Sequence, residues 1–169
     1  YVIDTNVLIQ APYAIECFEE NNLVLPLVVL EELDGLKKAE GEKGANARAA
    51  VRKLESYRQK GDLLQGVKLP GGGILRIEKN FVQVELPQDI PDDKPDNRIL
   101  KVCKGLAETE KEGQVILVTK DIVLRLKAQI LGIRAEDFER ERISEDDAQY
   151  TGRTEIYFPE DLAISSRGR

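Results

Sequence analysis

Two aspartates stand in polar triplets that follow short apolar runs, where buried strands would end. Asp4 directly follows the run 1–3, and Asp121 follows the run 115–118 after Thr119 and Lys120. Because parallel strands of an α/β sheet bring their carboxyl ends to one edge, we expect both carboxylates at that edge. An aspartate in such a position also commonly caps a helix or forms a turn, which is the alternative interpretation for each residue alone.

Two further acidic residues fit the same edge. Glu32 lies in an expected helix that follows the apolar run 23–25, and helical spacing places it, rather than Glu31, beside the apolar stripe of that helix. Asp96 follows Pro95 and opens another expected helix. The alternative interpretation for Asp96 is that it stabilises the positive end of that helix.

Four carboxylates at one edge would repel one another and raise one another's pKa unless a cation lies among them. Oxygen ligands favour Mg²⁺ or Mn²⁺ over zinc. A pair of such ions about 4 Å apart can activate water and stabilise the leaving oxygen in phosphodiester hydrolysis. The candidate chemistry is therefore metal-dependent hydrolysis, with the following candidate ligands: Asp4, Glu32, Asp96 and Asp121.

The composition agrees with this chemistry by exclusion. The chain has 169 residues, 41% of them hydrophobic and 33% charged, with a formal net charge of −6 and no histidine, methionine or tryptophan. This length and apolar content suit one globular domain. The lack of histidine excludes a Ser-His-Asp or Cys-His site and a His-ligated zinc within the chain.

The cysteines and the hydropathy favour a cytoplasmic protein. Cys17 and Cys103 are isolated, which predicts two buried thiols rather than a disulfide framework. No apolar run approaches the ~20 residues of a membrane span. Because the sequence starts at Tyr1 within an expected strand, we expect it to be a fragment of a longer polypeptide.

Apolar runs alternate with stretches of helical spacing, which predicts a parallel sheet covered on both faces. We expect strands at 1–3, 23–25, 115–118 and 132–135. Helices are expected at 13–20, from 26 to about 35, from a cap at Asn46 to Gly61, from 96 to about 107, and after 121. The predicted core face is Ile99, Val102, Cys103, Leu106 and Ala107 in the fourth helix, and Val123, Leu126, Lys127 and Ile130 in the fifth.

Between these elements, the segment 67–77 reads as a β-hairpin inserted on the sheet, with a further strand near 81–86. Its Gly71-Gly72-Gly73 segment is interpreted as the hairpin tip, and a phosphate-binding loop is the alternative. Residues 39–44 are expected to form a loop and 87–95 an acidic connector. We expect one domain at 1–140, and a polar linker at 141–169.

Four segments in order resemble the signature segments of the PIN-domain nucleases. They are Val2 to Ile9, Pro26 to Lys37, Asp96 to Leu100, and Val118 to Asp121. The resemblance covers roughly residues 1–138. The sequence Glu-Glu-Leu-Asp-Gly-Leu-Lys-Lys, followed by Asn46-Ala47-Arg48, is most similar to the PIN domain that precedes a PhoH-type ATPase.

The resemblance implies a three-layer α/β/α fold and a metal-dependent endonuclease that usually acts on RNA. By position, the metal-binding and catalytic acids would be Asp4, Glu32, Asp96 and Asp121, with Asn6 and Thr119 in supporting positions. It also implies an ATPase domain after residue 169 and a ring-shaped homo-oligomer. Some members carry another acid where this chain has Val123, so a weaker second metal site is expected.

Basic residues near these segments are candidates for binding the phosphates of single-stranded RNA, and the candidate substrate-binding residues are Lys37, Arg48, Arg98 and Lys120. For each one, an ordinary solvated charge is the alternative interpretation. Aromatic residues make up only 5% of the chain, so sequence-specific reading of bases is not expected. Two other functions stay open: a non-catalytic RNA-binding or assembly module, and a stand-alone toxin nuclease.

Overall fold

A computed structural model describes residues 1–110 and 113–139 of the chain. Its centre is a six-stranded sheet in the order β3-β4-β2-β1-β5-β6. The strands are β1 (Val2–Ile3), β2 (Leu23–Pro26), β3 (Val67–Lys68), β4 (Ile74–Glu78), β5 (Ile116–Val118) and β6 (Arg134–Glu136). Among the pairings of the described strands, β3–β4 alone is antiparallel, which confirms a mainly parallel α/β sheet.

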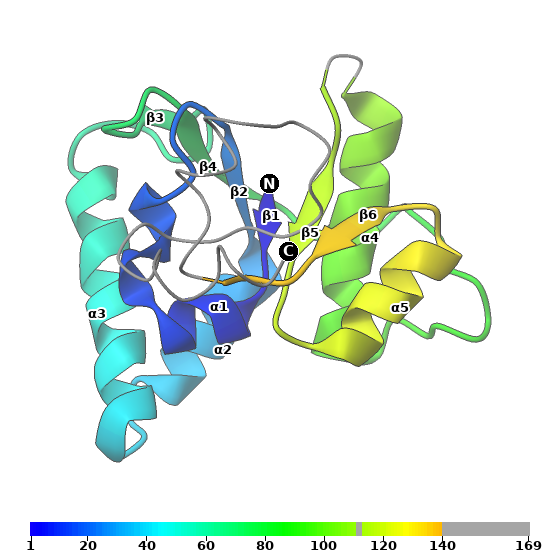
Figure 1. Cartoon of the computed structure of the whole chain (residues 1–169), viewed down its shortest axis with the longest axis horizontal. Coiled ribbons are helices and arrows are strands. Elements are labelled where there is room, and N and C mark those ends of the chain that lie inside the picture. The colour runs from blue at the N-terminus through cyan, green and yellow to red at the C-terminus, as the bar shows by residue number, and fades with distance from the viewer. Residues whose placement is uncertain (111–112, 140–169) are drawn as a thin grey trace, which may run out of the picture.

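Helices flank this sheet on two sides. They are α1 (Thr5–Gln10), the 3₁₀ helix η1 (Pro12–Glu16), α2 (Leu27–Leu36), α3 (Gly41–Arg58), α4 (Pro95–Thr109) and α5 (Ile122–Ile130). In Figure 1, α1, η1 and α3 pack together on one side of the strands, and α4 and α5 lie on the other. The expected fold class, an α/β domain with a central, mainly parallel sheet between helices, is confirmed.

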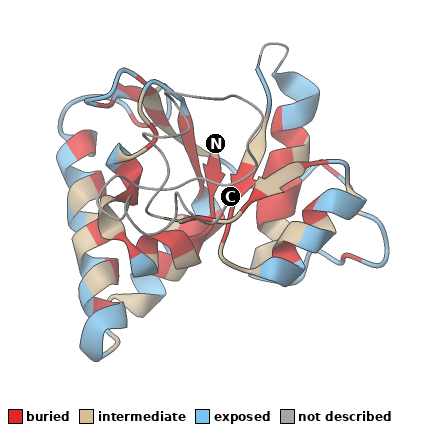
Figure 2. Ribbon diagram, in the orientation of Figure 1, coloured by how far each residue is buried: buried red, intermediate tan, exposed pale blue. Residues whose placement is uncertain are grey.

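The central strands β1 and β2 are buried because they are apolar and have helices on both faces. Val2 and Ile3 of β1 are at most 2% exposed, and all four residues of β2 are buried. Figure 2 shows this burial in the strands and along the inward faces of the helices. The buried strands therefore fix the positions of the polar residues that follow their carboxyl ends, such as Asp4 after β1 and Thr119 after β5.

The β3–β4 hairpin is confirmed, but it is part of the main sheet rather than an insertion on it. Besides pairing with β3, β4 pairs in parallel with all four residues of β2, from Leu23↔Leu75 to Pro26↔Glu78. The hairpin tip packs against another loop, since a Cβ at Gly73 would lie 1.9 Å from the Asn21 carbonyl oxygen. Glycine here permits close backbone approach within the fold, which supports the hairpin-tip interpretation.

In the N-terminal half of the chain, several of the expected helix boundaries were wrong. The first helix begins at Thr5, directly after Asp4, and residues 12–16 form only a 3₁₀ turn instead of a helix over 13–20. Helix α3 begins at Gly41, so residues 41–44 are helical and Asn46 is not a cap. Instead, Asn46 Nδ2 donates to the Ile9 carbonyl oxygen at 2.6 Å and ties α3 to α1.

The strand expected near 81–86 is not present in the described structure. Phe81 has a φ of +48°, a left-handed conformation that a strand cannot accommodate. Its ring packs on α4, where a Cβ at Gly105 would lie 2.2 Å from Phe81 Cδ1. The apolar residues of this segment thus cover α4 rather than extend the sheet.

The predicted core face is mostly correct for α4 and wrong for α5. In α4 the face is correct except for Ala107, which is exposed because it lies in the last turn of the helix, where residues 107–109 are all exposed. In α5 the prediction was wrong: the helix buries Leu124 and Ala128, while Val123, Leu126 and Ile130 are 54%, 53% and 71% exposed. Helix α5 thus has two apolar sides, and the side that packs inward is the one formed by Leu124 and Ala128.

The last strand expected at 132–135 is confirmed as β6, shifted by one or two residues. Among the described residues, no helix is both long enough and apolar enough to cross a membrane. The linker expected at 141–169 lies outside the described residues.

Candidate active site

The register of β1 and β5 places Asp4 next to Thr119. Val2 pairs with Leu117 and Ile3 with Val118, and the Asp4 amide donates to the Val118 carbonyl oxygen at 3.0 Å. Asp4 and Thr119, the residues that follow this last pair, therefore lie side by side where the two strands end. This brings together two residues that are 115 positions apart in the sequence.

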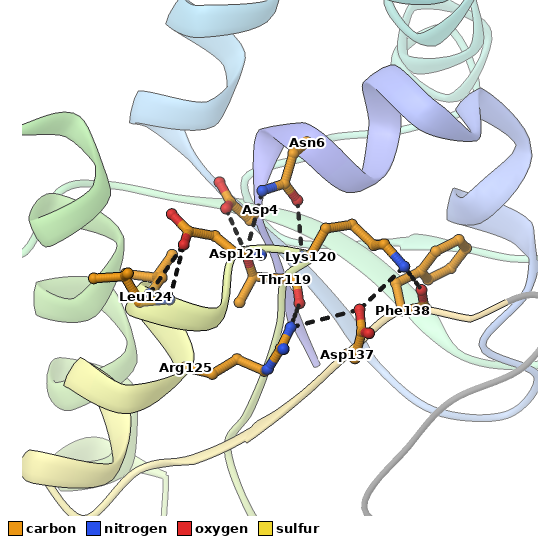
Figure 3. A network of polar contacts seen from close by, with 10 residues as sticks. Asp4, Asn6, Thr119, Lys120, Asp121, Leu124, Arg125, Asp137 and Phe138 are labelled. Carbon is orange, nitrogen blue, oxygen red and sulfur yellow. Dashed lines mark hydrogen bonds and ion pairs between the residues drawn. The ribbon is translucent and has the colours of Figure 1, made fainter.

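The Thr119 hydroxyl is the centre of the polar network drawn in Figure 3. It donates to Asp4 Oδ2 at 2.7 Å and accepts from the Asp121 amide at 3.0 Å and from Asn6 Nδ2 at 3.4 Å. Asn6 Oδ1 in turn accepts from the Lys120 amide at 3.1 Å. Thr119 is fully buried, so its hydroxyl fixes Asp4 and the turn before α5 in one arrangement.

Asp4 is 5% exposed and also caps α1, because its Oδ1 accepts from the Thr5 amide at 2.6 Å. Burial raises the pKa of Asp4 to about 6, against the opposing effect of hydrogen bonds from Thr119 and Thr5. The negative charges of Asp96 and Glu32 raise this pKa further. The carboxylate is thus costly to ionise in the absence of a cation.

Glu32 projects from α2 toward the same region. It is half-buried, whereas Glu31 is exposed. The Thr5 hydroxyl donates to Glu32 Oε1. The pKa of Glu32 is raised, first by burial and then by the charge of Asp96, with the Thr5 hydrogen bond acting in the opposite direction.

Asp96 and Asp121 lie at the N-terminal ends of α4 and α5. Asp96 is in the first turn of α4, near enough to raise the pKa of both Asp4 and Glu32. Asp121 caps α5, since its Oδ1 accepts from the Val123 and Leu124 amides at 2.9 and 3.4 Å. The capping role considered for Asp121 is therefore present, and Asp4 also caps a helix.

The four acids do not form a closed metal cage in this arrangement. Among the described residues, no three carboxylate or thiol groups are grouped closely enough to hold an ion. The donors nevertheless suit a hard divalent cation, because they are all oxygens and Asp4 ionises with difficulty among like charges. Such a cation would favour the ionised forms and draw the carboxylates together.

The four basic residues predicted to bind substrate all contact the protein itself. Lys37 pairs with Asp34 at 2.8 Å, and Lys120 pairs with Asp137 at 3.1 Å while donating to the Phe138 carbonyl oxygen. Arg48 and Arg98 donate only to backbone carbonyl oxygens. The positive charges of Lys37 and Lys120 are thus partly neutralised, whereas neither arginine forms an ion pair with a carboxylate among the described residues.

Three residues near the acids were not singled out from the sequence. Thr5 holds Glu32, and Asp137 follows β6 and pairs with Lys120 and with Arg125 at 3.5 Å. Arg125 also donates to the Thr119 carbonyl oxygen at 2.9 Å. Asp137 could have been found in the sequence as a polar residue that follows a parallel strand, as Asp4 does. That inference requires the end of β6, at Glu136, to be known.

A separate cavity of about 470 Å³ lies at the opposite ends of the strands. Its lining includes Tyr1, Asn22 and Arg76 and the start of β5. It contains none of the four acids and is not part of the candidate site.

Comparison with known proteins gives the following matches. The sequence profile of the PIN domain matches residues 1–139. The chain is 45% identical to protein PhoH2 of Bacillus subtilis over 100% of its own length, 37% identical to PhoH2 of Thermobispora bispora over 95%, and 38% identical to PhoH2 of Mycolicibacterium smegmatis over 92%. It spans 39%, 36% and 35% of the lengths of these three relatives.

Proposed function

The chain belongs to the PIN domain family, and we propose that it is a metal-dependent endoribonuclease domain that hydrolyses phosphodiester bonds. One observation carries this proposal: Asp4, Glu32 and Asp96 come from three separate segments, yet they lie close enough that Asp96 raises the pKa of both Asp4 and Glu32. Folded proteins rarely gather like charges at a strand edge without a function for them. A cation ligated by oxygen atoms gives these carboxylates such a function.

The four acids Asp4, Glu32, Asp96 and Asp121 would hold Mg²⁺ or Mn²⁺. The ion would lower the pKa of a bound water and stabilise charge on the phosphate. Thr119 and Asn6 keep Asp4 and the α5 turn in place through their hydrogen bonds, so that the ligands are preorganised. Thr5 performs the same role for Glu32.

Single-stranded RNA is the proposed substrate, with Lys37, Arg48, Arg98 and Lys120 near its phosphates. The three PhoH2 relatives are longer than this chain, which supports a PhoH-type ATPase domain on the same polypeptide. A homo-oligomer and a cytoplasmic location complete the proposal. The division into a nuclease domain at 1–140 and a linker at 141–169 belongs to it as well.

A non-catalytic RNA-binding module is the second candidate. The observation in its favour is that Asp4 and Asp121 already serve as helix caps and that no closed cage exists among the described residues. Thermal unfolding during a Mn²⁺ titration separates the two functions. A metal site raises the unfolding midpoint with Mn²⁺ concentration, whereas a binding module without metal shows a constant midpoint.

The direct test is an assay of the 169-residue chain on labelled single-stranded RNA and DNA. We expect internal cleavage of RNA with Mg²⁺ or Mn²⁺ and none with EDTA. Equal cleavage of DNA would correct the substrate, and cleavage that persists in EDTA would contradict the metal-dependent mechanism.

A further inference from the structure

Lys127, in the last turn of α5, is a cation that the sequence assigned only to helix packing. Its Nζ donates to Asn97 Oδ1 at 3.0 Å, and Asn97 is the residue after Asp96. This contact joins α5 to the first turn of α4, where the two helices pack. Lys127 therefore faces the end of α4 that carries one of the four acids.

Asn97 holds this arrangement firmly. It is 1% exposed, and its Nδ2 donates to the Pro91 carbonyl oxygen at 2.6 Å. Because the amide nitrogen is used in this way, the amide oxygen faces Lys127. The ammonium group is thus placed by a buried neutral group rather than by a flexible surface contact.

The charge of Lys127 also differs from that of its neighbours. Arg125 on the same helix and Lys120 before it both pair with Asp137. Within the part of the chain that the structure describes, Lys127 forms no ion pair with a carboxylate. Its contact with Asn97 uses one of three N–H donors and leaves the positive charge uncompensated.

The position of Lys127 on the helix keeps it accessible. It is half-buried, at the border between the buried stripe of Leu124 and Ala128 and the exposed side of α5. Val123, one turn earlier on the same side, is 54% exposed. Although Lys127 lies in the last turn of α5, its ammonium group meets the first turn of α4, so a chain of phosphates passing the N-terminal end of α4 can reach it.

We propose that Lys127 binds a backbone phosphate of the nucleic acid and positions it next to the acidic site. A lysine ammonium is a compact charge that binds phosphate oxygens without selecting a base. At the first turn of α4, which also carries Asp96, this charge offsets the repulsion between the carboxylates and an approaching polyanion. This inference rests on the proposed function, because it assumes that the substrate is a nucleic acid.

The test compares Lys127→Gln with Lys68→Gln, which removes an equal charge from an exposed position on β3. Both changes are made in an Asp4→Asn background, and binding of fluorescein-labelled single-stranded RNA is followed by anisotropy from 0.05 to 0.5 M salt. Loss of one phosphate contact reduces the slope of log Kd against log salt by about 0.7, which weakens binding about fivefold at 0.1 M salt. We expect this change for Lys127→Gln and not for Lys68→Gln, with most of it restored in Lys127→Arg.

An unchanged salt slope in Lys127→Gln overturns the inference, whether or not the unfolding midpoint falls, because a role confined to joining α5 to α4 affects stability alone. Failure of the chain to bind RNA at all overturns it too. A wild-type chain that binds RNA but leaves it intact with Mg²⁺ and Mn²⁺ contradicts the proposed cleavage only, since the salt slope still reports the contact at Lys127.

Discussion

The Thr119 hydroxyl donates to Asp4 Oδ2 at 2.7 Å and is itself fully buried. The same oxygen accepts from the Asp121 amide, so one hydroxyl connects two of the four candidate metal ligands. The contact depends on the parallel register of β1 and β5 and on the two polar residues that directly follow these strands.

Replacing Thr119 by Val keeps the shape of the side chain and removes this hydroxyl. Asp4 then loses a buried donor, and we expect the free energy of unfolding to fall by about 1–3 kcal/mol. Cleavage of RNA should fall at least tenfold, since Asp4 and the α5 turn are no longer fixed. Chemical denaturation and initial cleavage rates measure the two effects.

Thr109→Val is the matched control, because the Thr109 hydroxyl bonds only within its own helix at an exposed position. It should change neither quantity appreciably. Retention of full activity by Thr119→Val would show that the hydroxyl does not position the site.

The raised pKa of Asp4 predicts a pH-dependent stability in EDTA. Burial first, and then the neighbouring acids, raise the pKa of Asp4 from 3.8 to about 6, so between these values the folded state binds more protons than the unfolded state. The contribution of Asp4 to stability is therefore greatest below pH 4 and is lost as the pH rises to 6 and above. In Asp4→Asn the side chain does not ionise, so the stability that the wild type loses as the pH rises is retained.

We expect Asp4→Asn to be more stable than the wild type at pH 8, by up to about 3 kcal/mol, and to have no such advantage at pH 4. Melting curves of both chains from pH 4 to pH 8 provide the measurement. A variant that is less stable than the wild type at every pH would contradict the raised pKa.

Asp137→Asn should release Lys120 and Arg125 from their shared partner. With these charges free, RNA binding becomes tighter and its dependence on salt becomes steeper, by about 0.7 in slope for each new phosphate contact. Anisotropy titrations at several salt concentrations provide the measurement. Asp89→Asn changes the net charge equally at an exposed position and serves as the control; identical slopes in the two variants would exclude a role for Lys120 in binding.

Two glycines near the turn between α2 and α3 should respond in opposite ways to alanine. Gly35 lies in α2 with nothing near its missing Cβ, so Gly35→Ala should stabilise the chain by about 0.5–1 kcal/mol. A Cβ at Gly44 would lie 1.7 Å from the Ala39 carbonyl oxygen, so Gly44→Ala must displace the backbone and destabilise the chain. Unfolding midpoints of the two variants test whether this turn holds α2, and with it Glu32, in place.

The positions of the candidate acids could be predicted from the sequence because three of them lie at element ends and Glu32 lies on a helix with a clear apolar side. Asp4 and Asp121 follow strands whose apolar character is unambiguous, and parallel pairing brings such ends to one edge. Glu32 could be chosen over Glu31 because helical spacing places it beside buried residues. These inferences need only local patterns and the rule for parallel sheets.

The surroundings of the acids could not be predicted in the same way. The partner of Lys120 is Asp137, which is known only when the end of β6 is known, and the partner of Lys127 is a buried amide on another helix. Helix α5 shows a second limit: its two apolar stripes have the same period, and only the packed structure shows that Leu124 and Ala128 face inward. Periodicity predicts a helix but does not choose between two apolar faces.

Cleavage of single-stranded RNA by the wild-type chain and by Asp4→Asn, with Asp34→Asn as the control, tests the central claim most directly. Asp34 is an exposed acid on the same helix as Glu32 and pairs only with Lys37 among the described residues. We expect Mg²⁺- or Mn²⁺-dependent cleavage by the wild type and by Asp34→Asn, and its loss in Asp4→Asn with the fold intact. Equal cleavage by a folded Asp4→Asn chain would show that Asp4 is not needed for the reaction.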